Sequence, residues 1–165
     1  MSVIASDRAE VVLYGWRRQE KIQAKQESPP RRTQPMAVLV ADDNESYRSD
    51  LVEFLQKQKW IRVVGEAKNG NEALALTREM SPDLVLIDVN MPGMSGFEAT
   101  RQIKNLLPRA KVVFTTIHEK QTYDVLSEYL NADGFVCKSS AKREIPRVLK
   151  RLGFDIPSRQ PRGER

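Results

Sequence analysis

The sequence predicts an α/β fold built on a doubly wound parallel sheet. Between residues 36 and 152, short apolar runs rich in β-branched residues alternate with longer segments of helical character. Three of these runs are almost entirely apolar, which is typical of strands that helices cover on both faces. Because crossovers between parallel strands are right-handed, this alternation favours the doubly wound arrangement.

The expected elements follow in chain order. We predict strands at 37–41, 61–66, 84–87, 112–116 and 134–137, and helices at 45–58, 70–80, 96–107, 120–130 and 142–152. Leu51, Phe54 and Leu55 form an apolar stripe with helical spacing in the first helix. Pro146 predicts that the last helix starts late or is kinked.

Composition divides the 165 residues into three zones. The net charge is +5, of which residues 1–35 carry +3 and residues 153–165 carry +1. The middle zone therefore has a net charge of only +1, too little for strong binding to a polyanion. We expect 1–35 to be a basic flexible extension in which 9–25 forms a weak helix or a partner-docking helix, 36–152 to be the folded domain, and 153–165 to be a disordered tail.

Several classes of protein are excluded. The single cysteine, Cys137, excludes an internal disulfide framework and a multi-cysteine zinc site. The apolar runs are too short to span a membrane, so no membrane partner is expected. The chain opens without a signal-peptide pattern, which favours a cytoplasmic location.

Polar residues stand where the predicted strands end. Asp42 and Asp43 follow the first strand, Asp88 follows the third, and Thr116 ends the fourth. Lys138 follows the fifth strand. Ligands of doubly wound sheets bind beyond the carboxyl ends of the strands, so we expect these side chains to converge.

Such a cluster points to phosphoryl chemistry. Three close carboxylates repel one another unless a cation neutralises them, and oxygen-only ligation suits Mg²⁺ rather than zinc. A lysine and a hydroxyl can then hold a phosphoryl group. Asp88 is the best acceptor because it ends the central strand, and a carboxylate nucleophile that forms an acyl phosphate is established chemistry.

Four stretches in order resemble the receiver domains of response regulators in two-component signalling. They are VLVADD at 38–43, PDLVLID at 82–88, MPGMSG at 91–96, and Thr116 followed 22 positions later by Lys138 within ADGFVCK at 132–138. Thr115 is one residue off that spacing. The resemblance covers residues 36–152 and implies a flavodoxin-like (βα)5 domain with strand order 2-1-3-4-5.

The resemblance also implies roles for individual residues. Asp88 would accept phosphate from a histidine kinase or a histidine phosphotransfer protein, and Lys138 would pair with the phosphoryl oxygen. Asp42, Asp43, Asp88 and the backbone carbonyl of Asn90 would bind Mg²⁺. Thr116 and Phe135 would move as a switch, although Phe135 could equally be a plain core residue. Asn90, Ile117 and His118 would tune the lifetime of the phosphorylated form.

The output is expected to be a surface formed by residues 120–152. Lys138 precedes Ser139, which resembles receivers joined to helix-turn-helix output domains, yet only 13 residues follow Leu152. We therefore expect a stand-alone receiver without its own DNA-binding domain that acts on a protein target, and a phosphorylation-dependent homodimer is one form that this action could take. It would not be a conventional enzyme, although it would catalyse its own phosphorylation and dephosphorylation.

Two alternatives stay open. A degenerate receiver would serve only as a binding module. A Mg²⁺-dependent phosphohydrolase would use Asp88 on an external substrate, but Asn90 stands where haloacid-dehalogenase-like enzymes place a second carboxylate.

Overall fold

Five parallel strands form one sheet in the order β2-β1-β3-β4-β5. The structure is a computed structural model that describes residues 34–117 and 132–157. The strands are β1 (Met36–Ala41), β2 (Ile61–Ala67), β3 (Leu84–Asp88), β4 (Lys111–Thr116) and β5 (Gly134–Cys137). The predicted fold class and strand order are confirmed.

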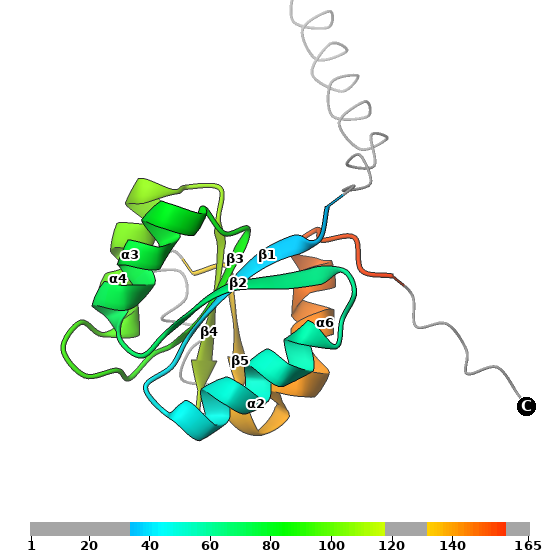
Figure 1. Ribbon diagram of the computed structural model, residues 1–165, viewed down its shortest axis with the longest axis horizontal. Coiled ribbons are helices and arrows are strands. Elements are labelled where there is room, and N and C mark those ends of the chain that lie inside the picture. Colours follow the sequence, from blue (N-terminus) through cyan, green and yellow to red (C-terminus); the bar gives the residue numbers. More distant parts are fainter. Residues whose placement is uncertain (1–33, 118–131, 158–165) are drawn as a thin grey trace, which may run out of the picture. The chain divides into compact units, whose positions relative to one another are not determined.

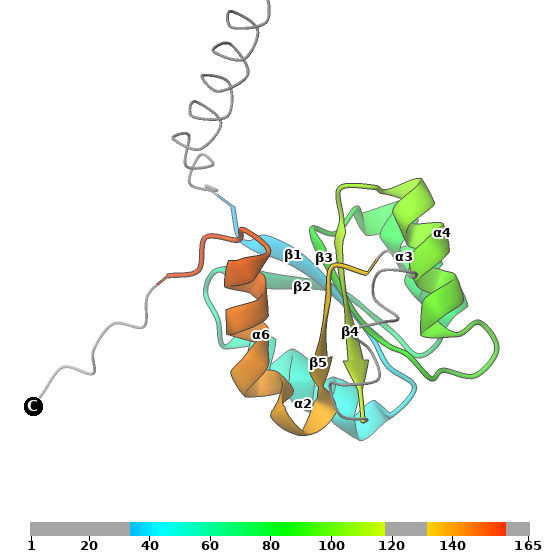
Figure 2. The ribbon, with the colours of Figure 1, turned by 180° about the vertical axis from the view of Figure 1, so that it is seen from behind.

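Helices lie on both faces of this sheet (Figure 1). On one face lie α2 (Glu45–Gln56) and α6 (Ala141–Arg151), and on the other lie α3 (Gly70–Met80) and α4 (Gly96–Leu106). The view from behind shows the same two layers (Figure 2). A short 3-10 turn, η2 (Lys138–Ser140), joins β5 to α6.

Alternate residues of the strands pack into two separate hydrophobic cores, one on each face of the sheet. Val38 and Val40 of β1 face α2 and α6, whereas Leu39 and Ala41 face α3 and α4. Phe114 of β4 belongs to the second core and meets the Phe97 ring edge-on, with 5.2 Å between ring centroids. Burial on both faces explains why these strands are nearly continuous in apolar residues.

Side-chain caps fix where the helices begin. Asn44 and Asn69 accept a hydrogen bond from the third residue beyond them, at the starts of α2 and α3. Ser95 and Glu98 form a reciprocal capping box at the start of α4. These caps place the helix starts at the carboxyl edge of the sheet, beside the ends of the strands.

The start of α6 and the turn that follows this helix both differ from the sequence-based prediction. The helix starts at Ala141 and contains Pro146 in its interior, so it does not start late. After it, Gly153 at φ +85° closes a Schellman turn, in which the Phe154 N–H donates to the Leu149 carbonyl. This turn carries Phe154 and Ile156 back against the first core, although they fall within the predicted tail 153–165.

Some predictions lie outside the described residues. They concern the extension before residue 34, the helix at 120–130, His118, and residues 158–165. Within residues 34–117 and 132–157, no helix is long and apolar enough to cross a membrane.

Candidate functional site

Three carboxylates meet at the carboxyl edge of the sheet. Asp42 and Asp43 follow β1, and Asp88 is the last residue of β3, the neighbouring strand. One oxygen from each carboxylate lies within 4.8 Å of the others. Asp42 and Asp88 are buried and Asp43 is exposed, so the cluster opens to solvent on the Asp43 side.

Lys138 completes the cluster from the other half of the sheet. Its Nζ lies 2.7 Å from Asp42 Oδ2 and 3.1 Å from Asp88 Oδ2. The side chain itself is only 13% exposed, so water screens these ion pairs weakly. The ammonium therefore bridges the buried members of the carboxylate cluster.

Asp42 is further fixed by the start of α2. Its Oδ1 accepts the backbone N–H of Asn44 at 3.0 Å, and its carbonyl accepts Arg48 at 2.7 Å. The Arg48 guanidinium also reaches Glu66 at the end of β2, at 3.4 Å. These contacts hold the acidic turn after β1 in one conformation.

Burial and the neighbouring charges have opposing effects on the pKa values of Asp88 and Lys138. Burial raises the pKa of Asp88, and the nearby Asp42 charge raises it further, against the lowering effects of Lys138 and the Asn90 backbone N–H. Burial alone would lower the pKa of Lys138, but its pairs with Asp42 and Asp88 raise it above its ordinary value. The site thus holds excess negative charge that one ammonium only partly balances.

The remaining predicted residues that the structure describes lie on β4, on β5 and in the segments that follow β3 and β4. Thr116 is buried at the end of β4, and its register partner is Cys137, which precedes Lys138. Phe135 is 8% exposed and belongs to the core under α3 and α4. Asn90 is exposed, and Ile117, which follows β4, is 70% exposed. His118 lies outside the described residues.

The loop after Asp88 packs tightly against two helix starts. A Cβ atom on Gly96, the first residue of α4, would lie 2.0 Å from the Asp88 carbonyl oxygen. A Cβ on Gly70, the first residue of α3, would lie 2.5 Å from the Met94 carbonyl oxygen. Both glycines therefore permit close backbone contacts that fix the loop carrying Asn90.

Sequence reasoning missed Tyr47. Lys138 Nζ lies 4.9 Å from the centre of its ring, a cation–π distance. The Tyr47 hydroxyl is buried and has no hydrogen-bond partner among the described residues. Burial, together with Asp42 and Asp88, raises its pKa. The available signal was an aromatic residue four positions before Leu51, which extends the apolar stripe of α2 back to the first turn and packs against the first core.

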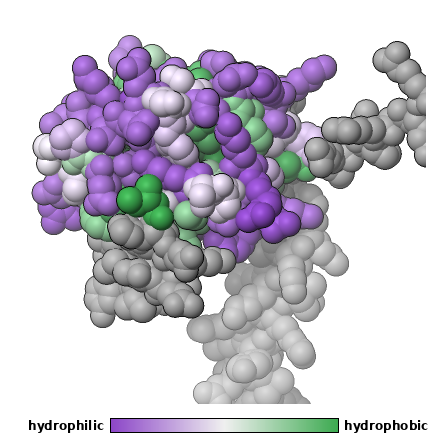
Figure 3. Space-filling view, turned by 90° about the horizontal axis from the view of Figure 1, so that it is seen from below, coloured by the Kyte–Doolittle hydropathy of each residue, from purple (hydrophilic) through white to green (hydrophobic). Residues whose placement is uncertain are grey.

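The described surface around this edge is mostly hydrophilic. Figure 3 looks from below, toward the end to which the arrowhead of β4 points in Figure 1, and shows only small hydrophobic spots among hydrophilic residues. A hollow of about 410 Å³ lies beside Lys138 and is lined by α2, η2 and the first turn of α6. The site therefore lies at an open polar edge rather than in an enclosed apolar cavity.

The residues present fit a hard divalent cation. The cluster offers oxygen donors alone, two of them on buried carboxylates and one on an exposed carboxylate. Mg²⁺ prefers oxygen ligands and keeps several of its waters, so a cluster that is open on one side suits it better than it suits zinc.

The fold recurs in known proteins. A family model described as "Response regulator receiver domain" matches residues 38–150. The response regulator GacA of Pseudomonas aeruginosa is 35% identical over 115 residues, which cover 70% of this chain and 54% of GacA. VraR of Staphylococcus saprophyticus is 36% identical over 119 residues, which cover 71% of this chain and 56% of VraR. The receiver domain of a NarL regulator from Mycobacterium tuberculosis has a TM-score of 0.66 at 30% identity, covering 73% of this chain and 97% of that domain.

These comparisons overturn the predicted set of partners, which excluded a DNA-binding domain. This chain spans only about half the length of the curated relatives it matches. Solved structures of the same fold include a DNA-binding response regulator from Staphylococcus aureus and an RcsB–DNA complex. The prediction was wrong because it used the number of residues after Leu152, which carries no information about an output domain.

Proposed function

The chain belongs to the response regulator receiver family, and on that premise we propose that Asp88 accepts a phosphoryl group from a histidine kinase or a phosphotransfer protein. The observation that carries the proposal is the bridging of Asp42 and Asp88 by Lys138, at 2.7 and 3.1 Å. A buried carboxylate held beside a fixed ammonium is ready both to attack phosphorus and to have the incoming charge balanced.

The transfer needs no further covalent partner. One Asp88 carboxylate oxygen forms a bond to phosphorus while the bond between phosphorus and the donor nitrogen breaks, and its electron pair stays with the donor. Lys138 stays protonated because its pKa is raised, so it supplies a positive charge throughout. Hydrolysis of the acyl phosphate by water would return Asp88 to its carboxylate form and complete the self-catalysed cycle.

Mg²⁺, held by Asp42, Asp43, Asp88 and the Asn90 backbone, would neutralise negative charge in this cluster and on the phosphoryl oxygens. The Lys138 ammonium lies 4.9 Å from the centre of the Tyr47 ring, and this contact would help to hold the ammonium beside the cluster. Access for donor and water is on the exposed Asp43 side.

We propose that Thr116 and Phe135 respond to the phosphoryl group as a switch. Thr116 is adjacent in register to Cys137, one residue before Lys138, so a movement at the end of β4 reaches the end of β5 directly. The surface formed by 120–152 would then change, of which β5, η2 and α6 are described. Tuning of the phosphorylated lifetime by Asn90, Ile117 and His118 stays a prediction, as does the cytoplasmic location.

Intact-mass spectrometry after incubation with acetyl phosphate and Mg²⁺ tests the proposal. We expect wild type to gain one phosphoryl group, Asp88→Asn to gain none, and Mg²⁺ removal with EDTA to suppress the gain. Asp155→Asn is the matched control, because Asp155 is exposed after α6, and it should be labelled like wild type. Labelling that persists in Asp88→Asn would refute the assignment of the acceptor.

The same preparations separate the alternatives. A degenerate receiver would leave wild type unlabelled at every Mg²⁺ concentration. A phosphohydrolase would turn over a stable phosphate ester such as p-nitrophenyl phosphate many times per chain, whereas a receiver would not.

A further inference from the structure

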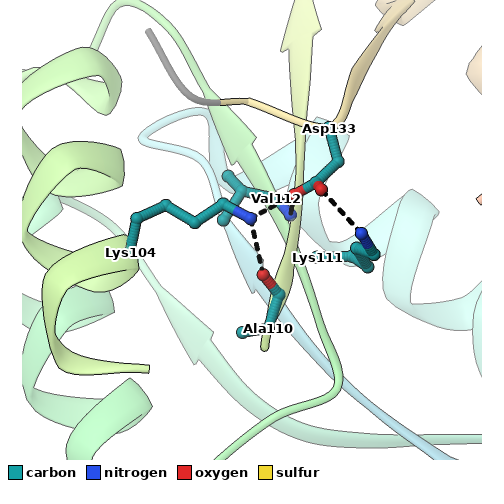
Figure 4. Close-up of polar contacts among 5 residues, drawn as sticks. All are labelled: Lys104, Ala110, Lys111, Val112 and Asp133. Carbon is teal, nitrogen blue, oxygen red and sulfur yellow. Dashed lines mark hydrogen bonds and ion pairs between the residues drawn. The ribbon is translucent and has the colours of Figure 1, made fainter. Parts of the chain in front are cut away.

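A second polar cluster holds the amino end of β5, at the opposite end of that strand from the acidic site. Asp133 immediately precedes β5, and its carboxylate accepts the Val112 N–H at 2.8 Å and Lys111 Nζ at 2.9 Å (Figure 4). Lys104 of α4 donates to the same carboxylate and to the Ala110 carbonyl. We call Asp133 with these partners the Asp133 clamp.

The clamp is largely shielded from water. The side chains of Asp133 and Lys104 are 15% and 14% exposed. Burial alone would raise the pKa of Asp133, but its contacts with Lys104, the Val112 N–H and Lys111 lower it below the ordinary value. Two ammonium groups from different elements thus converge on one carboxylate, which is more than the capping of a turn requires.

Asp133 hydrogen-bonds to the Val112 backbone through both its own backbone and its side chain. Its own N–H donates to the Val112 carbonyl at 2.8 Å, while its carboxylate accepts the Val112 N–H. The parallel register then runs from Val113 opposite Gly134 to Thr116 opposite Cys137. Among the described residues β5 is an edge strand that pairs with β4 alone, so these two hydrogen bonds set the register of the strand that leads into Lys138.

The same geometry recurs at the strand that carries Asp88. Asp83 precedes β3, donates its N–H to the Ala37 carbonyl at 2.9 Å, and accepts the Ala37 N–H at 2.9 Å. Asp83 stands five residues before Asp88, and Asp133 stands five residues before Lys138. Asp88 ends β3, and Lys138 directly follows β5. At the amino end of each of these strands, an aspartate hydrogen-bonds to the backbone of the adjacent strand.

We propose that Asp133 is a positioning residue for Lys138: the Asp133 clamp fixes the register of β5, and the register delivers the ammonium to Asp42 and Asp88. The action spans five residues, roughly 16 Å at about 3.3 Å per residue. A slip of one residue would turn the alternating side chains of β5 to the opposite face. The catalytic consequence rests on the proposed function of Asp88, whereas the placement of the ammonium does not.

The test compares labelling by acetyl phosphate in Asp133→Ala, Asp133→Asn and wild type. We expect Asp133→Ala to label about tenfold more slowly, since a misplacement of about 1 Å can cost on the order of 100-fold. Asp133→Asn keeps an acceptor for the Val112 N–H and should recover most of the rate. Asp133→Ala should still bind Mg²⁺, because the ligands lie at the ends of β1 and β3.

A double-variant comparison separates positioning from stability. In a Lys138→Met background, Asp133→Ala should slow labelling no further, since the group that it positions is gone. Ile61→Val, a truncation in the core at β2, controls for lost stability and should label like wild type once corrected for the folded fraction. An equal slowing by Asp133→Ala in both backgrounds would overturn the proposal, as would an unchanged rate in Asp133→Ala.

A second measurement does not depend on phosphorylation. The ¹H–¹⁵N signal of the Lys138 ammonium, assigned with Lys138→Met, reports its ion pairs in the metal-free protein. We expect Asp133→Ala to shift or abolish this signal and Asp133→Asn to retain it. An unaltered signal in Asp133→Ala overturns the positioning role, whereas failure of wild type to label while the signal responds would refute only the function of Asp88.

Discussion

Gly96→Ala should damage the acceptor loop although alanine is the better helix former. Gly96 is the first residue of α4, and its φ is not in the positive range. Where the backbone permits it, Gly→Ala stabilises a protein by about 0.4–1 kcal/mol. Here the new Cβ would lie 2.0 Å from the Asp88 carbonyl oxygen, 2.9 Å from its carbonyl carbon and 3.0 Å from Val89 Cα. The clash is with backbone, so no side chain can rotate away to relieve it.

The geometry sets the size of the effect. Ordinary contact begins at 3.4 Å, so the loop and the helix start must separate by about 1.4 Å. Overpacking of this kind costs about 1–3 kcal/mol or more, which exceeds the gain in helix propensity. We therefore expect a lower free energy of unfolding in urea, and labelling of Asp88 slowed by up to about 100-fold.

Gly65→Ala is the matched control for this substitution. Its Cβ would meet Leu39 Cδ1 at 3.0 Å and Leu76 Cδ1 at 3.3 Å, which are the ends of flexible side chains on the face away from Asp88. It should lose less stability and label like wild type. If Gly96→Ala were as stable and as readily labelled as wild type, the close packing of α4 on the Asp88 backbone would be refuted.

Two further predictions concern charge and polarity. Because the folded pKa of Asp133 is below its ordinary value of 3.8, its ionised form stabilises the fold above that pH, and the contribution is lost as pH falls through the lowered pKa. Urea unfolding from pH 7 to pH 2 should therefore show Asp133→Asn less stable than wild type near neutrality, with the difference shrinking below about pH 4; a constant difference would contradict the ion pairing. Tyr47→Phe should be at least as stable as wild type, because the buried hydroxyl has no partner among the described residues, and should label normally. Tyr47→Leu removes the ring beside Lys138 and should label more slowly; equal labelling by both variants would exclude a role for the ring.

Topology explains why the sequence predicted so much of the fold and of the central cluster. A parallel sheet directs all strand ends to one edge, so Asp42, Asp88 and Lys138 could be placed together from the end of each apolar run alone. Alternation of buried residues along β1 and β3 likewise follows from two covered faces. Element ends were less predictable, because Lys57 and Leu107 continue the helical pattern while the structure places them at helix caps.

The features that were missed depend on contacts across elements. Phe154 and Ile156 fall in a Pro- and Arg-rich stretch whose composition predicts disorder, yet after the turn at Gly153 they pack against the first core. Tyr47 lies four residues before Leu51 and packs against the first core, but only the three-dimensional position of Lys138 reveals the cation–π contact of its ring. Neither contact leaves a periodic signal in the sequence, because each joins one residue to a distant element.

Asp133 shows most clearly how position along a strand differs from position in space. In the sequence it stands before a glycine, as a turn residue would, and Lys104 and Lys111 look like ordinary surface lysines. The pairing of β4 with β5 and the position of α4 bring the three charges together, and that pairing is the register which the charges themselves fix. The residue types at the acidic edge therefore predict the chemistry, whereas the geometry that chemistry requires depends on residues at the other end of the same strands.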